Sequence, residues 1–101
     1  MKKTIIILAS LLITSLSNPI LAAGDAEAGQ AKTATCMGCH GLAGNSTIPS
    51  FPKLAGQGEA YILKQLQYFK SGERKNAMMA GVASMLSDQD MEDLAAYYSI
   101  Q

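Results

Sequence analysis

Apolar residues recur at helical spacing in two stretches of the C-terminal half of the chain. From Glu59 to Gly72 they fall three or four positions apart, which predicts a helix with Gly72 as its C-cap. Further on, Ser87 and Asp90 form a capping box, and the pattern behind it predicts a helix that reaches Ile100. The apolar face of this last helix comprises Met91, Leu94, Ala95 and Tyr98.

A third helix is predicted over residues 24–35, where alanines dominate and Asp25 is a suitable N-cap. Gly29 in its middle costs roughly 1 kcal/mol relative to alanine, so it is either tolerated on the surface or, the interpretation we favour, present because another helix crosses close by. Residues 41–58 and 73–84 lack periodicity and are predicted to be irregular. The first of these is a loop of 18 residues, a length that is uncommon unless the loop has a function.

The N-terminus has the pattern of a secretory signal peptide. Lys2 and Lys3 precede an uncharged run from Thr4 to Ser17, and small residues follow, with cleavage expected after Ala22. The run is 14 residues long, fewer than the ~18 apolar residues that a bilayer span requires. We therefore expect residues 1–22 to be removed during export and residues 23–101 to form one domain without a membrane span.

Charge narrows the functional classes. The full chain has eight basic and eight acidic side chains, so removal of Lys2 and Lys3 leaves six against eight, a net charge of −2. This balance argues against non-specific nucleic-acid binding, which needs a basic surface. Residues 53–75 carry five basic and two acidic side chains, whereas residues 88–93 carry four acids and no base. The asymmetry predicts either electrostatic steering of a charged partner or two ordinary solvated helix faces.

The strongest chemical signal is the string Cys36-Met37-Gly38-Cys39-His40, which holds both cysteines and the only histidine. In an exported protein this spacing fits covalent haem attachment, a dithiol or disulfide pair, or part of a zinc site. A thioredoxin-like pair needs strands that the pattern does not predict, and zinc needs three or four protein ligands. Covalent haem, with two thioethers and an adjacent axial histidine, is therefore favoured. A domain of this size also needs such a staple.

Methionine is the available ligand for the second axial position of the iron. Four methionines follow the second helix, and Met91 is assigned to the apolar face of the last helix. Met78 and Met79 lie 38 and 39 residues after His40, far enough to return on the opposite side of the haem. The pattern alone does not separate Met78 from Met79.

The chain resembles the class I cytochromes c, particularly the small periplasmic type found singly or as tandem halves of dihaem cytochromes. The resemblance covers essentially the whole mature chain. Its motifs are residues 36–41 (CMGCHG), 44–46 (GNS), 51–57 (FPKLAGQ), the helix at 61–69, 79–83 (MAGVA), 86–90 (LSDQD) and 94–98 (LAAYY). It implies an all-α cytochrome c fold, with about three main helices plus loops wrapped around one covalently bound haem c.

The resemblance also implies roles for particular residues. Cys36 and Cys39 would form the thioethers, and His40 and Met79 would be the axial iron ligands. The assignment of Met79 rests on its position seven residues before the leucine of the Leu-Ser-Asp motif, and Met78 is the fallback. The carbonyl of Pro52 would accept the Nδ1 proton of His40.

Two further features follow from the resemblance. Gly29 and Tyr97 match the place where the first and last helices of the family cross. Arg74 is a candidate for contact with a haem propionate, although a solvated loop arginine explains it equally well.

The function implied is electron transfer in the bacterial periplasm, without a catalytic residue or an enzymatic reaction. Redox proteins would be the partners, among them a membrane-bound oxidase or reductase, and a monomer is expected. The alternative is a haem-based sensor or enzyme whose distal ligand is displaced by a small molecule. Without haem the chain should be largely disordered.

Overall fold

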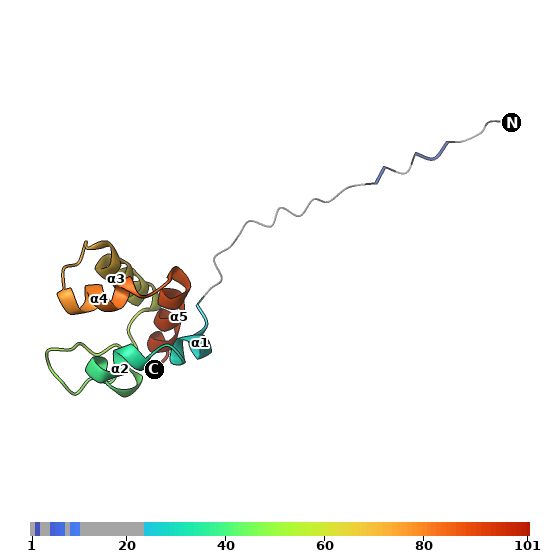
Figure 1. Ribbon diagram of the computed structural model, residues 1–101. Coiled ribbons are helices and arrows are strands. Elements are labelled where there is room, and N and C mark those ends of the chain that lie inside the picture. The colour runs from blue at the N-terminus through green and yellow to red at the C-terminus, as the bar shows by residue number, and fades with distance from the viewer. Residues whose placement is uncertain (1, 3–4, 8, 11–23) are drawn as a thin grey trace.

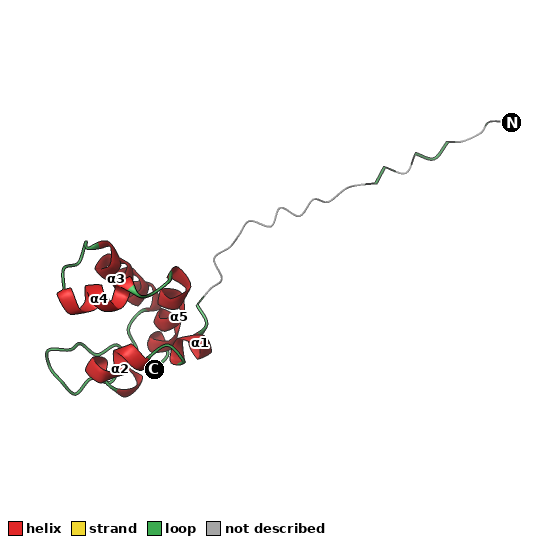
Figure 2. Cartoon of the chain, viewed as in Figure 1, coloured by secondary structure: helices red, strands yellow, loops and turns green. Residues whose placement is uncertain are grey.

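The computed structural model describes residues 2, 5–7, 9–10 and 24–101 (Figure 1). The predicted signal peptide, residues 1–22, lies largely outside this part and stays a prediction. All regular structure described is helical (Figure 2), which confirms the all-α class. The elements are α1 (Ala26–Gln30), α2 (Ala34–His40), the 3₁₀ turn η1 (Leu42–Gly44), α3 (Glu59–Ser71), α4 (Ala77–Ser84) and α5 (Asp88–Ser99). No helix in the described ranges is long and apolar enough to cross a membrane.

The single helix predicted over residues 24–35 is wrong in its extent, because the chain turns at residues 31–33 and α2 then continues to His40. Asp25 caps α1 as expected, since its side chain accepts the N–H groups of Glu27 at 2.9 Å and Ala28 at 3.2 Å. The hydroxyl of buried Thr33 donates to the carbonyl of Gln30 at 2.9 Å, a local bond that competes with continuation of the helix. The Cys-x-x-Cys-His string therefore lies on a helix of its own.

The prediction of an irregular segment over residues 73–84 is wrong from Ala77 onward, because Ala77–Ser84 forms α4. The Asn76 side chain caps this helix by accepting the N–H of Met79 at 3.0 Å. Residues 77–83 are all apolar or glycine. No polar face marks the helical period, and the helix is therefore invisible to a periodicity argument.

The two C-terminal helices form as predicted and supply the core. Gly72 ends α3 in the left-handed conformation with φ 86°, and the capping box of Ser87 and Asp90 starts α5. Helices α3 and α4 lie together at the upper left of Figure 1, α2 with the loop after it lies below them, and α5 lies to the right of both. The buried cluster between α3 and α5 consists of Ile62, Leu94, Ala95 and Tyr98.

Helix α1 crosses α5 at Gly29, as the sequence indicates. A Cβ atom on Gly29 would lie 2.0 Å from the carbonyl oxygen of Asp93 and 2.8 Å from Cβ of Tyr97. Backbone meets backbone at this point, and only glycine leaves the necessary space. The close crossing accounts for a residue that is unfavourable inside a helix.

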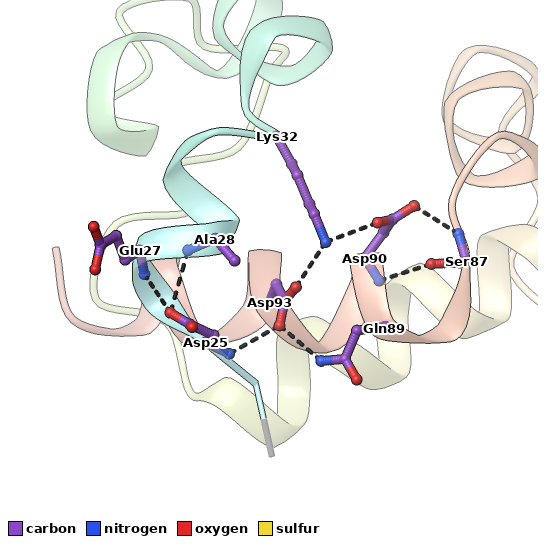
Figure 3. A network of polar contacts seen from close by, with 8 residues as sticks. All are labelled: Asp25, Glu27, Ala28, Lys32, Ser87, Gln89, Asp90 and Asp93. Atoms are coloured by element: carbon purple, nitrogen blue, oxygen red, sulfur yellow. Dashed lines mark hydrogen bonds and ion pairs between the residues drawn. The ribbon is translucent and has the colours of Figure 1, made fainter. Parts of the chain in front are cut away.

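A polar network joins the same two helices (Figure 3). Asp93 is 3 % exposed, and its carboxylate accepts from the Asp25 N–H at 2.9 Å, Lys32 Nζ at 2.7 Å and Gln89 Nε2 at 2.8 Å. Lys32 also pairs with Asp90 at 2.8 Å. Three donors compensate for the burial of the Asp93 charge, as a buried carboxylate requires.

The network changes the charge distribution inferred from the sequence. Lys32 lowers the pKa of Asp90 to about 2 and also lowers the pKa of Asp93, because both carboxylates accept hydrogen bonds from its ammonium group. Two of the four acids in residues 88–93 are thus paired within the molecule. The acidic stretch is a less negative surface than its sequence indicates, which weakens the case for electrostatic steering.

Candidate haem-binding site

A cavity of about 330 Å³ opens between α2 and its following loop on one side and α3 and α4 on the other. Helix α5 contributes to its wall through Leu94 and Tyr98. Most of the lining is apolar, which suits the faces of a flat aromatic ring system. The apolar side chains include Phe51, Leu54, Ile62, Leu66, Phe69, Val82 and Leu86.

Helix α2 places Cys36, Cys39 and His40 along this cavity. Both thiols are free, Cys36 half-buried and Cys39 exposed. His40 is 7 % exposed, and its Nδ1 lies 2.8 Å from the carbonyl oxygen of Pro52, the contact that the sequence resemblance implied. Since a carbonyl oxygen only accepts, Nδ1 carries the proton in this contact, and Nε2 is the ring nitrogen left for a metal.

Helix α4 supplies the methionines. Met78 and Met79 both line the cavity, but Met78 is 61 % exposed whereas Met79 is half-buried. The Asn76 cap holds the backbone of Met79 in the first turn of the helix. These differences support Met79 as the distal ligand, and its assignment stays a prediction.

Arg74 lies in the lining of the cavity but has partners of its own. Its Nη1 donates to Gln65 Oε1 at 2.8 Å, and its guanidinium carbon lies 4.6 Å from the centre of the Phe69 ring. The side chain is thus held beside α3 as a cation at the cavity. Its contact with a propionate stays a prediction.

Comparison with known proteins decides the family. Residues 26–99 match the family described as Cytochrome c. The chain belongs to the cytochrome c family. It is 54 % identical over 105 residues to cytochrome c4 of Stutzerimonas stutzeri, a match covering 94 % of this chain and 50 % of that protein.

Structural similarity agrees. The crystal structure of reduced recombinant cytochrome c4 from Pseudomonas stutzeri superposes with a TM-score of 0.75 at 58 % identity, covering 78 % of this chain and 46 % of that one. This cytochrome c thus spans about half the length of the c4 relatives it matches. Cytochrome c-554(548) of Halomonas halodenitrificans, 44 % identical, is matched over 78 % of this chain and 99 % of its own length.

The residues of this cytochrome c fit a covalently bound haem. Two thiols, a histidine with a free Nε2 and a thioether side chain border one apolar cavity, and this is the donor set that haem c uses. A structural zinc site would need three or four ligands. Within the described ranges, no group of three or more His, Cys, Asp or Glu side chains gathers where it could hold a metal ion.

One polar atom of the cavity was not foreseen from the sequence. The hydroxyl of Tyr98 is buried and has no hydrogen-bond partner among the described residues. Burial, followed by the neighbouring Cys36, raises the pKa of Tyr98, which keeps the hydroxyl protonated. Sequence reasoning placed Tyr98 only in the apolar face of α5. The signal that could have identified the hydroxyl is the residue type, because phenylalanine would be sufficient for packing in an apolar face.

Proposed function

We propose that this cytochrome c is a periplasmic carrier of single electrons that uses one covalently bound haem c per chain. The proposal rests on one observation: the helix with the Cys-x-x-Cys-His string, α2, and the helix with the methionines, α4, border the same apolar cavity. Such a site needs no substrate pocket and makes no bond in its reaction. The proposal therefore includes no enzymatic activity.

Each residue has one task in this proposal. Cys36 and Cys39 anchor the haem through thioethers, and His40 and Met79 are the axial ligands. The Pro52 carbonyl fixes the orientation of the His40 ring and increases its basicity through the Nδ1 hydrogen bond. When bound, the haem supplies the one-electron couple of its iron, and the thioether ligand and apolar lining favour the reduced state.

The partners would be redox proteins, a membrane-bound oxidase or reductase among them. One relative, 44 % identical over 67 % of this chain, is named thiosulfate dehydrogenase electron acceptor, from Thiomonas intermedia. That name supports a role in receiving and passing on electrons. Cys39 lines the cavity and is exposed, so the haem edge attached to it would face solvent. A redox partner would dock at this edge, and the carrier would act as a monomer.

The proposal is tested by the visible spectrum of protein expressed in a periplasm with haem-maturation machinery. After denaturing extraction, haem should remain on the chain, and the native reduced protein should be low-spin and should not bind carbon monoxide. Met79→Ala should keep covalent haem but bind carbon monoxide and have a lower reduction potential. Met78→Ala, the matched control on the adjacent exposed residue, should behave like the wild type.

Three results would contradict parts of this proposal. Absence of retained haem would overturn the cytochrome function. Carbon monoxide binding by the wild type would favour the alternative of a sensor or haem enzyme with a displaceable ligand. An altered spectrum in Met78→Ala together with an unchanged one in Met79→Ala would reverse the ligand assignment.

A further inference from the structure

The Tyr98 hydroxyl is buried against the cavity and has no hydrogen-bond partner in the part of the chain that the structure describes, although its ring is tightly fixed. The residue is 2 % exposed and belongs to the buried cluster of α3 and α5. A Cβ on Gly44 would lie 2.8 Å from Cδ1 of Tyr98, so the ring occupies the space that glycine leaves. The Tyr98 carbonyl also accepts the Gly56 N–H at 2.9 Å. Ring and backbone are thus held, and the hydroxyl has no freedom to reach a distant acceptor.

The Cys36 sulfur lies close enough to this hydroxyl to contribute to the raised pKa of Tyr98. Cys36 is partly buried, packs against the same cluster and lines the same cavity as Tyr98. A buried hydroxyl without a partner is destabilising, and phenylalanine would fill the same volume without that cost. The tyrosine therefore indicates an acceptor that becomes available in the finished protein. A free thiol is both a weak donor and a weak acceptor, whereas a thioether sulfur has lost its proton and can only accept.

We propose that the Tyr98 hydroxyl donates a hydrogen bond to the Cys36 sulfur once that sulfur is the haem thioether, and that Tyr98 is a positioning residue for this edge of the haem. The inference rests on the proposed function, because it requires haem attachment at Cys36. The raised pKa of Tyr98 is consistent with a hydroxyl that stays protonated as donor. The positive end of the O–H dipole of Tyr98 would point at the haem edge. It would therefore favour the reduced state, in which the iron carries less positive charge.

The experiment compares wild type with Tyr98→Phe, which removes only the hydroxyl, and with Tyr97→Phe as matched control. Tyr97 is the adjacent tyrosine, in edge contact with Tyr98 at 5.1 Å between ring centres and only half-buried. Denaturing extraction first establishes covalent haem in the wild type; its absence would count against the proposed function, not against the role of Tyr98 alone. Reduction potentials and resonance Raman spectra of the carbon–sulfur stretch, in H₂O and D₂O, follow on the loaded proteins.

We expect a deuterium-sensitive carbon–sulfur band in wild type and Tyr97→Phe, and loss of that sensitivity with a lower potential in Tyr98→Phe. A wild-type band that is insensitive to deuterium would overturn the inference even if Tyr98→Phe fails to fold. An unchanged potential with greater resistance to denaturant in Tyr98→Phe would show an unpaired hydroxyl without function. A potential shift without the isotope effect would overturn Cys36 as the acceptor.

Discussion

Alanine at position 29 should destabilise this cytochrome c although alanine is the better helix former. The substitution gains up to about 1 kcal/mol of helix propensity. Its Cβ, however, would lie 2.0 Å from the carbonyl oxygen of Asp93, and ordinary van der Waals contact begins at 3.4 Å. The backbones of α1 and α5 must therefore separate by about 1.4 Å, which strains the Asp93 hydrogen bonds as well.

Overpacking of this kind costs about 1–3 kcal/mol, and the lengthened hydrogen bonds of a charged group add about 1.5–3 kcal/mol at most. After subtraction of the propensity gain, we expect a net loss of about 2 kcal/mol in the free energy of unfolding. For a domain of this size that corresponds to a melting temperature lower by roughly 10 °C.

Gly81→Ala is the matched control, because Gly81 lies inside α4 and nothing is within 4 Å of its added Cβ. That variant should gain about 0.5–1 kcal/mol. Urea denaturation followed by circular dichroism measures both variants on the haem-loaded protein. If Gly29→Ala proved as stable as the wild type, the close crossing would not be the reason for glycine there.

Two further predictions concern a helix cap and an ion pair. Asn76→Ala should lose about 1 kcal/mol of stability in urea denaturation because Met79 loses its capping acceptor, whereas Asn76→Asp, which can still cap, should retain most of it; equal losses would exclude the cap. Lys32 lowers the pKa of Asp90 from 3.8 to about 2, so this pair stabilises the folded state fully above about pH 4 and ceases to do so as the pH falls toward 2. Lys32→Met should therefore flatten stability measured against pH in this window, and an unchanged slope would contradict the role of the pair.

The sequence pattern correctly predicted the helices that have one apolar face. The spacing of residues 59–72 and the capping box at Ser87 predicted α3 and α5 nearly to their ends. Helix α4 was missed because apolar residues lie on all its sides, so no apolar–polar period marks it. The helix forms through its packing against α3 and its place beside the cavity, which the sequence pattern does not show. The break between α1 and α2 was missed because residues 31–33, where the chain turns, contain neither glycine nor proline to mark it.

The candidate site was predictable where its chemistry is local in sequence. Cys36, Cys39 and His40 are neighbours on one helix, whereas the pattern alone did not separate Met79 from Met78, and the preference for Met79 is what the family resemblance implies. The unpaired Tyr98 hydroxyl was not predictable, since it depends on the distance between α5 and α2 in the folded chain. The pairing of Lys32 with Asp93 was missed for the same reason, because 61 residues separate them.

The carboxylate of Asp93 does more than compensate its own burial. The close crossing at Gly29 already brings the backbones of α1 and α5 together at one point. Gln89 lies on α5 itself, but the other two donors to Asp93, the Asp25 N–H and Lys32 Nζ, come from the two ends of α1 and reach the carboxylate together in this alignment of the helices. Polar contacts of this kind select a helix register even where they add little stability. We expect this alignment of α1 with α5 to determine which residue of α5 lies opposite the cysteines of α2, and therefore the position of the haem edge.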